Sequence, residues 1–231
     1  TTDIEEATGG ADTIAGNAQA DIILGGVNDG GTDMLYGDAP SQGGSDADDL
    51  SLGDNGLLHF VYDWKGDADP TDQNYAPEDN DQHTLDLVRA YTDDLGGTDI
   101  ISGDDGGDLI LGGNAGDQIH GDNPTADAGA DDGDDIALGD NGDVYFTGAS
   151  GARVVLSSAV ERIVTTDDAE ATGGADLIEG NAGADIILGG VNDGGIDRLY
   201  GDARSPVSSL DGADILLGDN GVLDYGQFGD L

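Results

Sequence analysis

The chain has 231 residues, with 50 Asp and Glu against six Lys and Arg, a net charge of −44, 42 Gly and no Cys. One-sided charge with only 36% hydrophobic residues is typical of chains that repel themselves and stay disordered. The lack of a basic patch excludes nucleic acids as partners, and the missing cysteines exclude disulfides and thiolate metal sites. What such a charge favours is the binding of cations.

Targeting and membrane segments are not recognisable in the sequence. No apolar stretch approaches the roughly 18 residues that predict a membrane-spanning helix. There is no initiator Met and no basic-then-apolar leader at the start. The sequence begins and ends within its own repeat pattern, so we expect it to be part of a longer protein.

Repeats organise the chain, and they argue against disorder. Residues 6–39 recur as residues 170–203 with 29 of 34 positions identical, and a looser copy lies between them. Each copy opens with Gly-Gly-x-Asp and closes with Leu-Gly-Asp-Asn-Gly. The predicted units are modules 1–56, 95–142 and 172–221, separated by an inter-module segment at 57–94, a second at 143–171 and the start of a third at 222–231.

A nine-residue period runs inside the modules. Residues 103–111 read GDDGGDLIL, residues 112–120 read GGNAGDQIH, and residues 180–188 read GNAGADIIL. These fit G-G-x-G-x-D-x-U-x, with U a large aliphatic residue, and the chain resembles the repeats-in-toxin (RTX) hemolysin-type calcium-binding family. The resemblance implies an all-β fold, a right-handed parallel β-roll or β-solenoid of Gly-Asp-rich nonapeptides, interrupted here by short hairpin or strand inserts. It also implies several calcium ions bound by turn carbonyls and Asp carboxylates.

The residues support the same interpretation without the family. Glycines permit tight turns, and each short x-U-x segment is a minimal strand. When parallel strands stack, the Asp of one turn lies above the Asp of the next, and these carboxylates repel unless a hard cation such as calcium lies between them. The predicted metal ligands are Asp12, Asp21, Asp33, Asp49, Asp99, Asp108, Asp117, Asp135, Asp176, Asp185, Asp197 and Asp214. The alternative is that these are solvated turn residues.

Six further Asp residues are candidate ligands. Asp38, Asp122 and Asp202 each follow a turn-opening Gly. Asp54, Asp140 and Asp219 belong to the Asp-Asn-Gly sequence that closes each module, where they either bind metal or only form the turn. Two of the repeats, 25–36 and 189–200, have 12 residues, and elsewhere Gln19 and Ala115 replace the glycine at the fourth position of the nonapeptide.

The inter-module segments are apolar and predict extra strands. Residues 57–62, 144–146 and 222–225 follow the three closing sequences, and 144–146 with 153–156 predict a β-hairpin. The acidic stretch 63–84 contains Pro70 and Pro77 and predicts a surface loop.

Alternation along the short strands predicts which side chains point inward. The expected core is Ile14, Ile23, Leu35, Ile101, Ile110, Ile119, Ile178, Ile187, Leu199 and Leu216. In every second strand the two outward neighbours are apolar, as in Leu109 and Leu111, which gives a stripe too large to leave in water. Either the inter-module strands or a second copy of the chain should cover it.

Enzyme motifs are missing from the sequence, and His59, His83 and His120 are scattered, with His120 expected to be solvated. We therefore expect a non-catalytic calcium-binding structural module of a large secreted or surface protein, of adhesin, surface-layer or matrix-fibre type. Export unfolded by a bacterial type I-like machine would fit the family. The alternatives are an accessory domain of an RTX hydrolase or toxin and, less favoured, an ice-binding protein.

Overall fold

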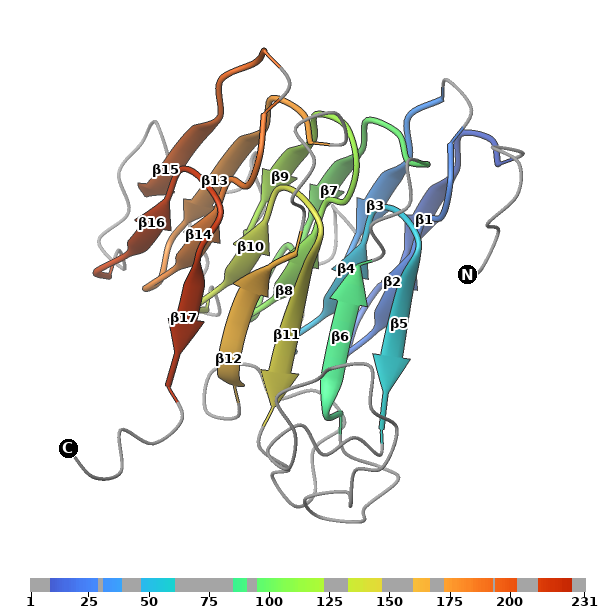
Figure 1. Ribbon diagram of the computed structural model, residues 1–231. Helices are drawn as coiled ribbons and strands as arrows, with labels where there is room; N and C mark the ends of the chain where they lie inside the picture. The colour runs from blue at the N-terminus through green and yellow to red at the C-terminus, as the bar shows by residue number, and fades with distance from the viewer. Residues whose placement is uncertain are drawn as a thin grey trace, which may run out of the picture.

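A computed structural model describes residues 9–28, 31–38, 47–60, 85–90, 95–122, 133–146, 160–166, 173–192, 194–202 and 212–225. These residues form three stacked β-sheets (Figure 1). Strands account for all their regular structure, and no helix among them is long and apolar enough to cross a membrane. The prediction of an all-β chain built on parallel sheets is confirmed.

Two of the sheets are parallel and six-stranded, and consecutive module strands alternate between them. Sheet A has the spatial order β1 (Thr13–Ala15), β3 (Met34–Tyr36), β7 (Ile100–Ser102), β9 (Gln118–His120), β13 (Leu177–Asn181) and β15 (Arg198–Asp202). Sheet B has the order β2 (Ile22–Leu24), β4 (Leu50–Leu52), β8 (Leu109–Leu111), β10 (Ile136–Leu138), β14 (Ile186–Leu188) and β16 (Ile215–Leu217). Strands from different modules are therefore direct neighbours, as β3 and β7 are.

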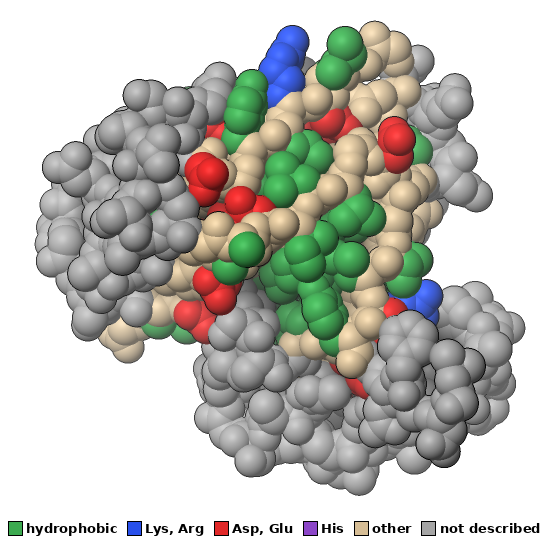
Figure 2. All heavy atoms as spheres, turned by 90° about the vertical axis from the view of Figure 1, so that its left-hand side faces the viewer, with side chains coloured by type: hydrophobic (Ala, Val, Ile, Leu, Met, Phe, Trp, Pro, Cys, Tyr) green, Lys and Arg blue, Asp and Glu red, His purple; other side chains and the backbone are tan. Residues whose placement is uncertain are grey.

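The core between sheets A and B comes from the middle residue of each strand. These residues align in register, so that Leu35 is opposite Ile101 and Ile101 is opposite Ile119. Seen along the stack, hydrophobic side chains fill the space between the strands (Figure 2). One buried cluster unites Ile23, Leu35, Ile101, Ile110, Ile119, Ala137, Ile178 and Ile187, with Ile14 and Leu199 packed against it.

Three core positions differ from the expectation. Leu216 was predicted to be buried, but 42% of it is exposed because β16 is the last strand of sheet B. Ser51 and Ala137 occupy inward positions although neither is the large aliphatic residue that the repeat predicts there, and both are 1% exposed. A small residue is tolerated there because neighbouring strands supply isoleucines on either side.

The inter-module segments form a third, antiparallel sheet. Sheet C has the order β17 (Val222–Asp224), β12 (Val160–Thr165), β11 (Gly142–Phe146), β6 (Leu87–Ala90) and β5 (Gly56–His59). The prediction of the hairpin is wrong in its second strand, because β11 pairs with residues 160–165 and not with 153–156. Residues 153–156, which the sequence favoured, and the acidic stretch 63–84 lie outside the described residues.

Sheet C covers the apolar stripe of sheet B. Leu52, Leu111 and Leu138 from sheet B form one buried cluster with Val88, Val144 and Ile163 from sheet C. All six are at most 1% exposed. The local cover expected from the inter-module strands is confirmed.

The nonapeptide turns use left-handed backbone at their second and fourth positions. In the turn before β9, Gly113 has φ 109° and Ala115 has φ 71°, and in the turn before β2, Asn17 has φ 78° and Gln19 has φ 83°. Glycine adopts this conformation without steric cost, which explains why the repeat favours it at these positions. Ala115 and Gln19 keep the same turn geometry at a steric cost.

Candidate metal-binding site

The predicted Asp ligands lie in two rows, one along each parallel sheet, each Asp directly preceding a strand. The row of sheet A contains Asp12, Asp33, Asp99, Asp117, Asp176 and Asp197. The row of sheet B contains Asp21, Asp49, Asp108, Asp135, Asp185 and Asp214. All twelve residues that the repeat singles out are thus brought into register, although up to 66 residues of sequence separate neighbours in a row.

One oxygen of each carboxylate is used within the row. The backbone N–H of each Asp donates to Oδ1 of the next Asp at 2.6–3.1 Å, as Asp99 does to Asp117 and Asp108 does to Asp135. These bonds fix the side chains and aim the second oxygen toward the neighbouring turn. The same geometry therefore repeats at every level of the stack.

The second oxygen is buried without a hydrogen bond in most turns. This holds for Oδ2 of Asp21, Asp33, Asp99, Asp108, Asp117, Asp135, Asp176 and Asp185. Buried polar atoms are nearly always satisfied by protein, water or an ion, so a row of unsatisfied carboxylate oxygens calls for a positively charged partner.

Backbone carbonyls converge with these oxygens. A Cβ atom built on Gly112 would lie 2.3 Å from both Oδ2 of Asp117 and the carbonyl oxygen of Gly139. On Gly103 it would lie 2.0 Å from Oδ2 of Asp108 and 2.4 Å from the Gly121 carbonyl. Only glycine leaves room for two oxygens from different turns to approach one point.

Burial and mutual repulsion raise the pKa values of the row. Burial is the largest cause at Asp99, Asp176 and Asp185, and raises each pKa from 3.8 to about 7. Burial, followed by repulsion from neighbouring Asp residues, also raises the pKa values of Asp117 and Asp135 well above the ordinary 3.8. The ionised rows are therefore unfavourable by themselves, and either protons or cations relieve them.

The chemistry of these donors fits a hard divalent cation. Carboxylate and carbonyl oxygens without nitrogen or sulfur are the ligands that calcium prefers. Among the described residues, no three Asp, Glu, His or Cys side chains converge on one point, so side chains alone do not form a metal cage. A bound ion would depend on one or two carboxylates together with turn carbonyls.

In the second group of candidates, Asp38 and Asp122 follow β3 and β9 of sheet A, and Asp202 is the last residue of β15. Asp38 and Asp122 are buried, whereas Asp202 is exposed at the last strand. Asp122 Oδ2 accepts the backbone N–H of Ala182 at 2.9 Å, which ties it to the next module. These residues are therefore not part of the two rows.

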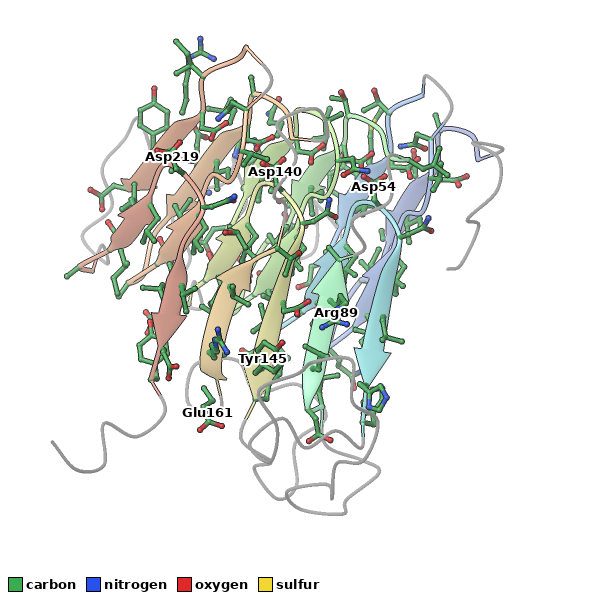
Figure 3. The ribbon with its side chains drawn as sticks, viewed as in Figure 1. Asp54, Arg89, Asp140, Tyr145, Glu161 and Asp219 are labelled. Atoms are coloured by element: carbon green, nitrogen blue, oxygen red, sulfur yellow. The ribbon has the colours of Figure 1, made fainter. Side chains whose placement is uncertain are left out.

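The closing Asp residues join one module to the next. Asp54, Asp140 and Asp219 lie along one edge of the stack, one in each module (Figure 3). Asp54 accepts the N–H of Gly97 at 3.1 Å and that of Asn114 at 2.8 Å, and Asp140 accepts the N–H of Gly174 at 3.3 Å. Burial, followed by repulsion from Asp99, raises the pKa of Asp54 to about 8. Asp54 and Asp140 therefore do more than form the closing turn, because each also binds the opening Gly-Gly of the following module.

Two asparagines that sequence reasoning missed support the Asp rows. Asn28 Nδ2 donates to Oδ1 of Asp99 at 2.8 Å, and Asn192 Nδ2 donates to Oδ2 of Asp197 at 2.7 Å. Both belong to the Val-Asn-Asp-Gly-Gly sequence of the 12-residue repeats. Because the same five residues occur in both 12-residue repeats, they could have predicted that the longer turns have a defined structure.

The expectation of a solvated His120 is wrong. His120 is 4% exposed, and its Nδ1 lies 3.1 Å from Oε2 of Glu179 on the neighbouring strand β13. Its Nε2 lies 2.8 Å from Nε2 of Gln118. Pairing across adjacent strands allows a histidine to be buried at this outward position.

A charged network on sheet C was also not foreseen. Arg89 on β6 is opposite Asp143 on β11, and its Nε and Nη2 donate to the two carboxylate oxygens at 2.7 Å each. The Tyr145 hydroxyl donates to Asp143 at 3.0 Å, and Arg162 lies 5.9 Å from the centre of the Tyr145 ring. Arg89 and Tyr145 lie close together in Figure 3. This network fastens the covering sheet.

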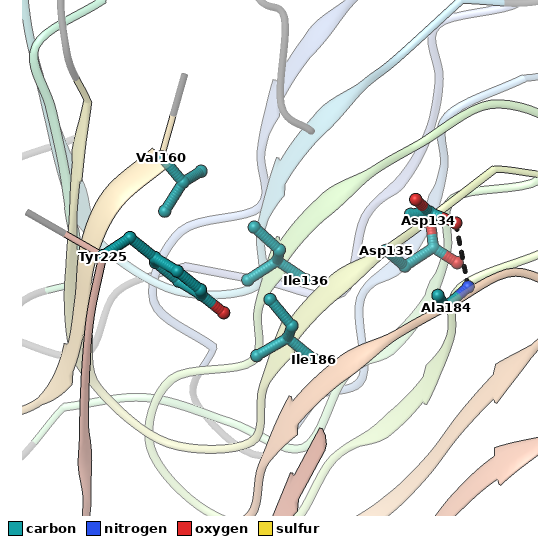
Figure 4. A pocket seen from close by; sticks show the side chains of 7 residues that line it. All are labelled: Asp134, Asp135, Ile136, Val160, Ala184, Ile186 and Tyr225. Carbon is teal, nitrogen blue, oxygen red and sulfur yellow. Dashed lines mark hydrogen bonds between the residues drawn. The ribbon is translucent and has the colours of Figure 1, made fainter. Parts of the chain in front are cut away.

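A cavity of about 210 Å³ opens between sheets B and C (Figure 4). Ile136, Val160, Ile186 and Tyr225 line its apolar side, and Asp134 and Asp135 its acidic side. Asp134 is occupied by a hydrogen bond of 2.9 Å from the N–H of Ala184. The cavity is below the roughly 300 Å³ of typical small-molecule sites, so it carries no functional assignment.

Comparison of the chain with protein family models, with curated proteins and with solved structures found no match.

Proposed function

We propose that this chain is a non-catalytic, calcium-binding structural module of a large secreted or cell-surface protein, folded as a right-handed parallel β-roll of the RTX type. The supporting observation is the double row of Asp residues, most of which have one oxygen held by a neighbouring turn and the other buried without a hydrogen bond. In most turns a glycine carbonyl adds a second oxygen to the same point.

The proposed role of calcium is to make folding conditional on the surroundings. With a net charge of −44 and carboxylates stacked turn upon turn, the ionised chain opposes its own compact state. An ion that binds only the folded rows supplies folding free energy in proportion to the logarithm of its concentration. Low cytosolic calcium would keep the chain open for export, and extracellular calcium would close it.

The test is a calcium titration of the chelator-treated chain, followed by isothermal calorimetry and circular dichroism. We expect an expanded, coil-like chain without calcium and a compact, β-rich chain at millimolar calcium. Magnesium at the same concentration is the control, and should act poorly because it requires a small octahedral site and retains its waters. A β-rich spectrum that is unchanged by chelator, or heatless mixing with calcium, would overturn the proposal.

A further inference from the structure

The inter-module segments are inserted within single turns of the stack formed by sheets A and B. When β5 and β6 are left out, strands of the two sheets alternate along the chain without a break, because β4 of sheet B leads to β7 of sheet A. Residues 53–55 therefore begin a turn that residues 96–99 complete. We call this a split turn, and residues 56–95 its insert. A second split turn consists of residues 139–141 and 173–176, with residues 142–172 as its insert.

The split turns have the same internal geometry as the uninterrupted turns. In the uninterrupted turn before β9, Oδ2 of Asp117 and the carbonyl oxygen of Gly139 converge on the position that a Cβ atom of Gly112 would occupy. In the first split turn, Oδ2 of Asp99 and the carbonyl oxygen of Gly112 converge in the same way on Gly53. The first glycine and the Asp of this turn are thus on opposite sides of the insert. The turn is complete only when the two ends of the insert meet.

The two halves of each split turn supply the oxygens of one candidate metal site. Oδ2 of Asp99 and Oδ2 of Asp176, from the second halves, are buried without a hydrogen bond. The first halves add a further buried carboxylate, Asp54 or Asp140, where the turn before β9 has Gly113. Asp54 lies close enough to Asp99 for their negative charges to repel each other. A split turn therefore contains two buried carboxylates, against one in the turn before β9, and has the greater requirement for a cation.

The split turns lie at the roots of the covering strands. Strand β5 begins at Gly56, directly after the first half of its split turn, and Gly56 is opposite Ala90 at the end of β6. Strand β11 likewise begins at Gly142, opposite the last residue of β12. Figure 3 shows Asp54 and Asp140 at the end of the stack where these strands begin. Closing a split turn therefore brings together the ends of a pair of covering strands.

We propose that the cation bound at each split turn is the clasp of its insert, and that it couples ion binding in the stack to docking of the covering strands on sheet B. The identity of this cation as calcium rests on the proposed function. In an uninterrupted turn the backbone already holds the first glycine near the Asp. In a split turn the ends of a long loop must be brought together, at an entropic cost that grows with loop length. The ion offsets this cost because it binds oxygens from both ends, and by linkage the docked strands raise its affinity equally.

Three variants within one Asp row test the clasp. Asp99→Asn alters the first split turn, Asp176→Asn alters the second, and Asp117→Asn alters the uninterrupted turn between them. Each variant removes one charge and keeps an oxygen to accept the N–H of the preceding Asp in the row. Asp117→Asn is therefore the matched control. Each variant is measured at the calcium concentration that gives it the circular dichroism spectrum of the wild type, so that every sample is folded.

Hydrogen exchange followed by mass spectrometry measures the covering strands separately from the stack. In Asp99→Asn we expect exchange in β5 and β6 to be at least about tenfold faster than in the wild type, with a smaller change in β12. In Asp176→Asn the large change should be in β11 and β12. Asp117→Asn should change exchange in β9 more than in any covering strand. Additional calcium should slow the exchange again, because a weakened site then fills by mass action.

Equal acceleration of the covering strands in all three variants would overturn the inference. Unchanged exchange in β5 and β6 of Asp99→Asn, or an acceleration that additional calcium does not reverse, would also overturn it. If Asp99→Asn does not fold at any calcium concentration, Asp99→Glu must give the same selective pattern, because it keeps the charge and displaces its oxygens by one methylene group.

Failure of the inference and failure of the proposed function give different results. A wild-type chain that folds on calcium, with variants that lack the selective pattern, removes the clasp and leaves the proposed function intact. A wild-type fold that chelator does not change contradicts the proposed function in the titration, before any variant is measured.

Discussion

The backbone N–H of Asp117 donates a 2.7 Å hydrogen bond to Oδ1 of Asp176, joining two modules across 59 residues of sequence. The same carboxylate holds its Oδ2 buried without a hydrogen bond. One side chain therefore both fastens two turns and leaves a negative charge to be neutralised.

Replacing Asp108 by Asn should raise the calcium concentration at the folding midpoint roughly tenfold, because the charge is lost while an oxygen remains to accept the Asp49 N–H. The matched control is Asp105→Asn in the same turn, which removes an equal charge from outside the row and should change the midpoint little. A calcium titration by circular dichroism measures both. Equal shifts would mean that only the total charge matters.

Without calcium, acid should stabilise the fold. The folded pKa values of Asp99, Asp176 and Asp185 are about 7, above the ordinary 3.8, so the folded chain binds protons more tightly than the unfolded chain. Their contribution is complete below pH 3.8 and is lost as pH rises through about 7. In chelator, we expect more β-structure at about pH 5.5 than at about pH 8. The acid sample is kept at about pH 5.5 because a lower pH would approach the pI of 4.1, where the chain would precipitate.

Saturating calcium should reverse that trend, because protons then compete with the metal for the carboxylates. Asp185→Asn should weaken the acid effect seen in chelator, whereas substitution of the exposed Asp224 should preserve it. Circular dichroism at a series of pH values gives the comparison. A chelated chain that is more structured at pH 8 than at acid pH would contradict the prediction.

Gln19→Gly should stabilise the calcium-bound fold by about 1 kcal/mol, because Gln19 has φ 83° and glycine adopts that conformation without strain. The adjacent Ala18 is exposed and does not have a positive φ. Ala18→Gly should therefore destabilise by roughly 0.5–1 kcal/mol through backbone entropy. Urea unfolding at fixed calcium measures both changes, and effects of the same sign would refute the turn geometry.

Arg89→Met should destabilise the fold by roughly 2 kcal/mol, since it leaves the buried Asp143 carboxylate with only the Tyr145 hydroxyl. Arg162→Met removes a cation–π contact and should cost about 0.5–1 kcal/mol. Thermal unfolding in calcium separates the two. A larger loss for Arg162 would show that the paired charges of β6 and β11 do not fasten sheet C.

The sequence by itself determined the period, the inward residues and the register. A strand of three residues repeated with an Asp before it leaves one arrangement that aligns Ile101 with Ile119 and stacks Asp99 on Asp117, because side chains alternate and strands are evenly spaced. The apolar neighbours Leu109 and Leu111 also predicted a covering layer, for such a stripe is unstable in water.

Only the tertiary structure decided how distant residues meet. The ion pair of Arg89 with Asp143 and the burial of His120 against Glu179 join strands far apart in the chain, and β11 pairs with residues 160–165 instead of the nearer segment that the sequence favoured. No local pattern encodes such contacts, because each depends on which strand becomes the neighbour of which. The exposure of Leu216 has the same origin: its sequence is that of a core residue, and its position on the last strand leaves it uncovered.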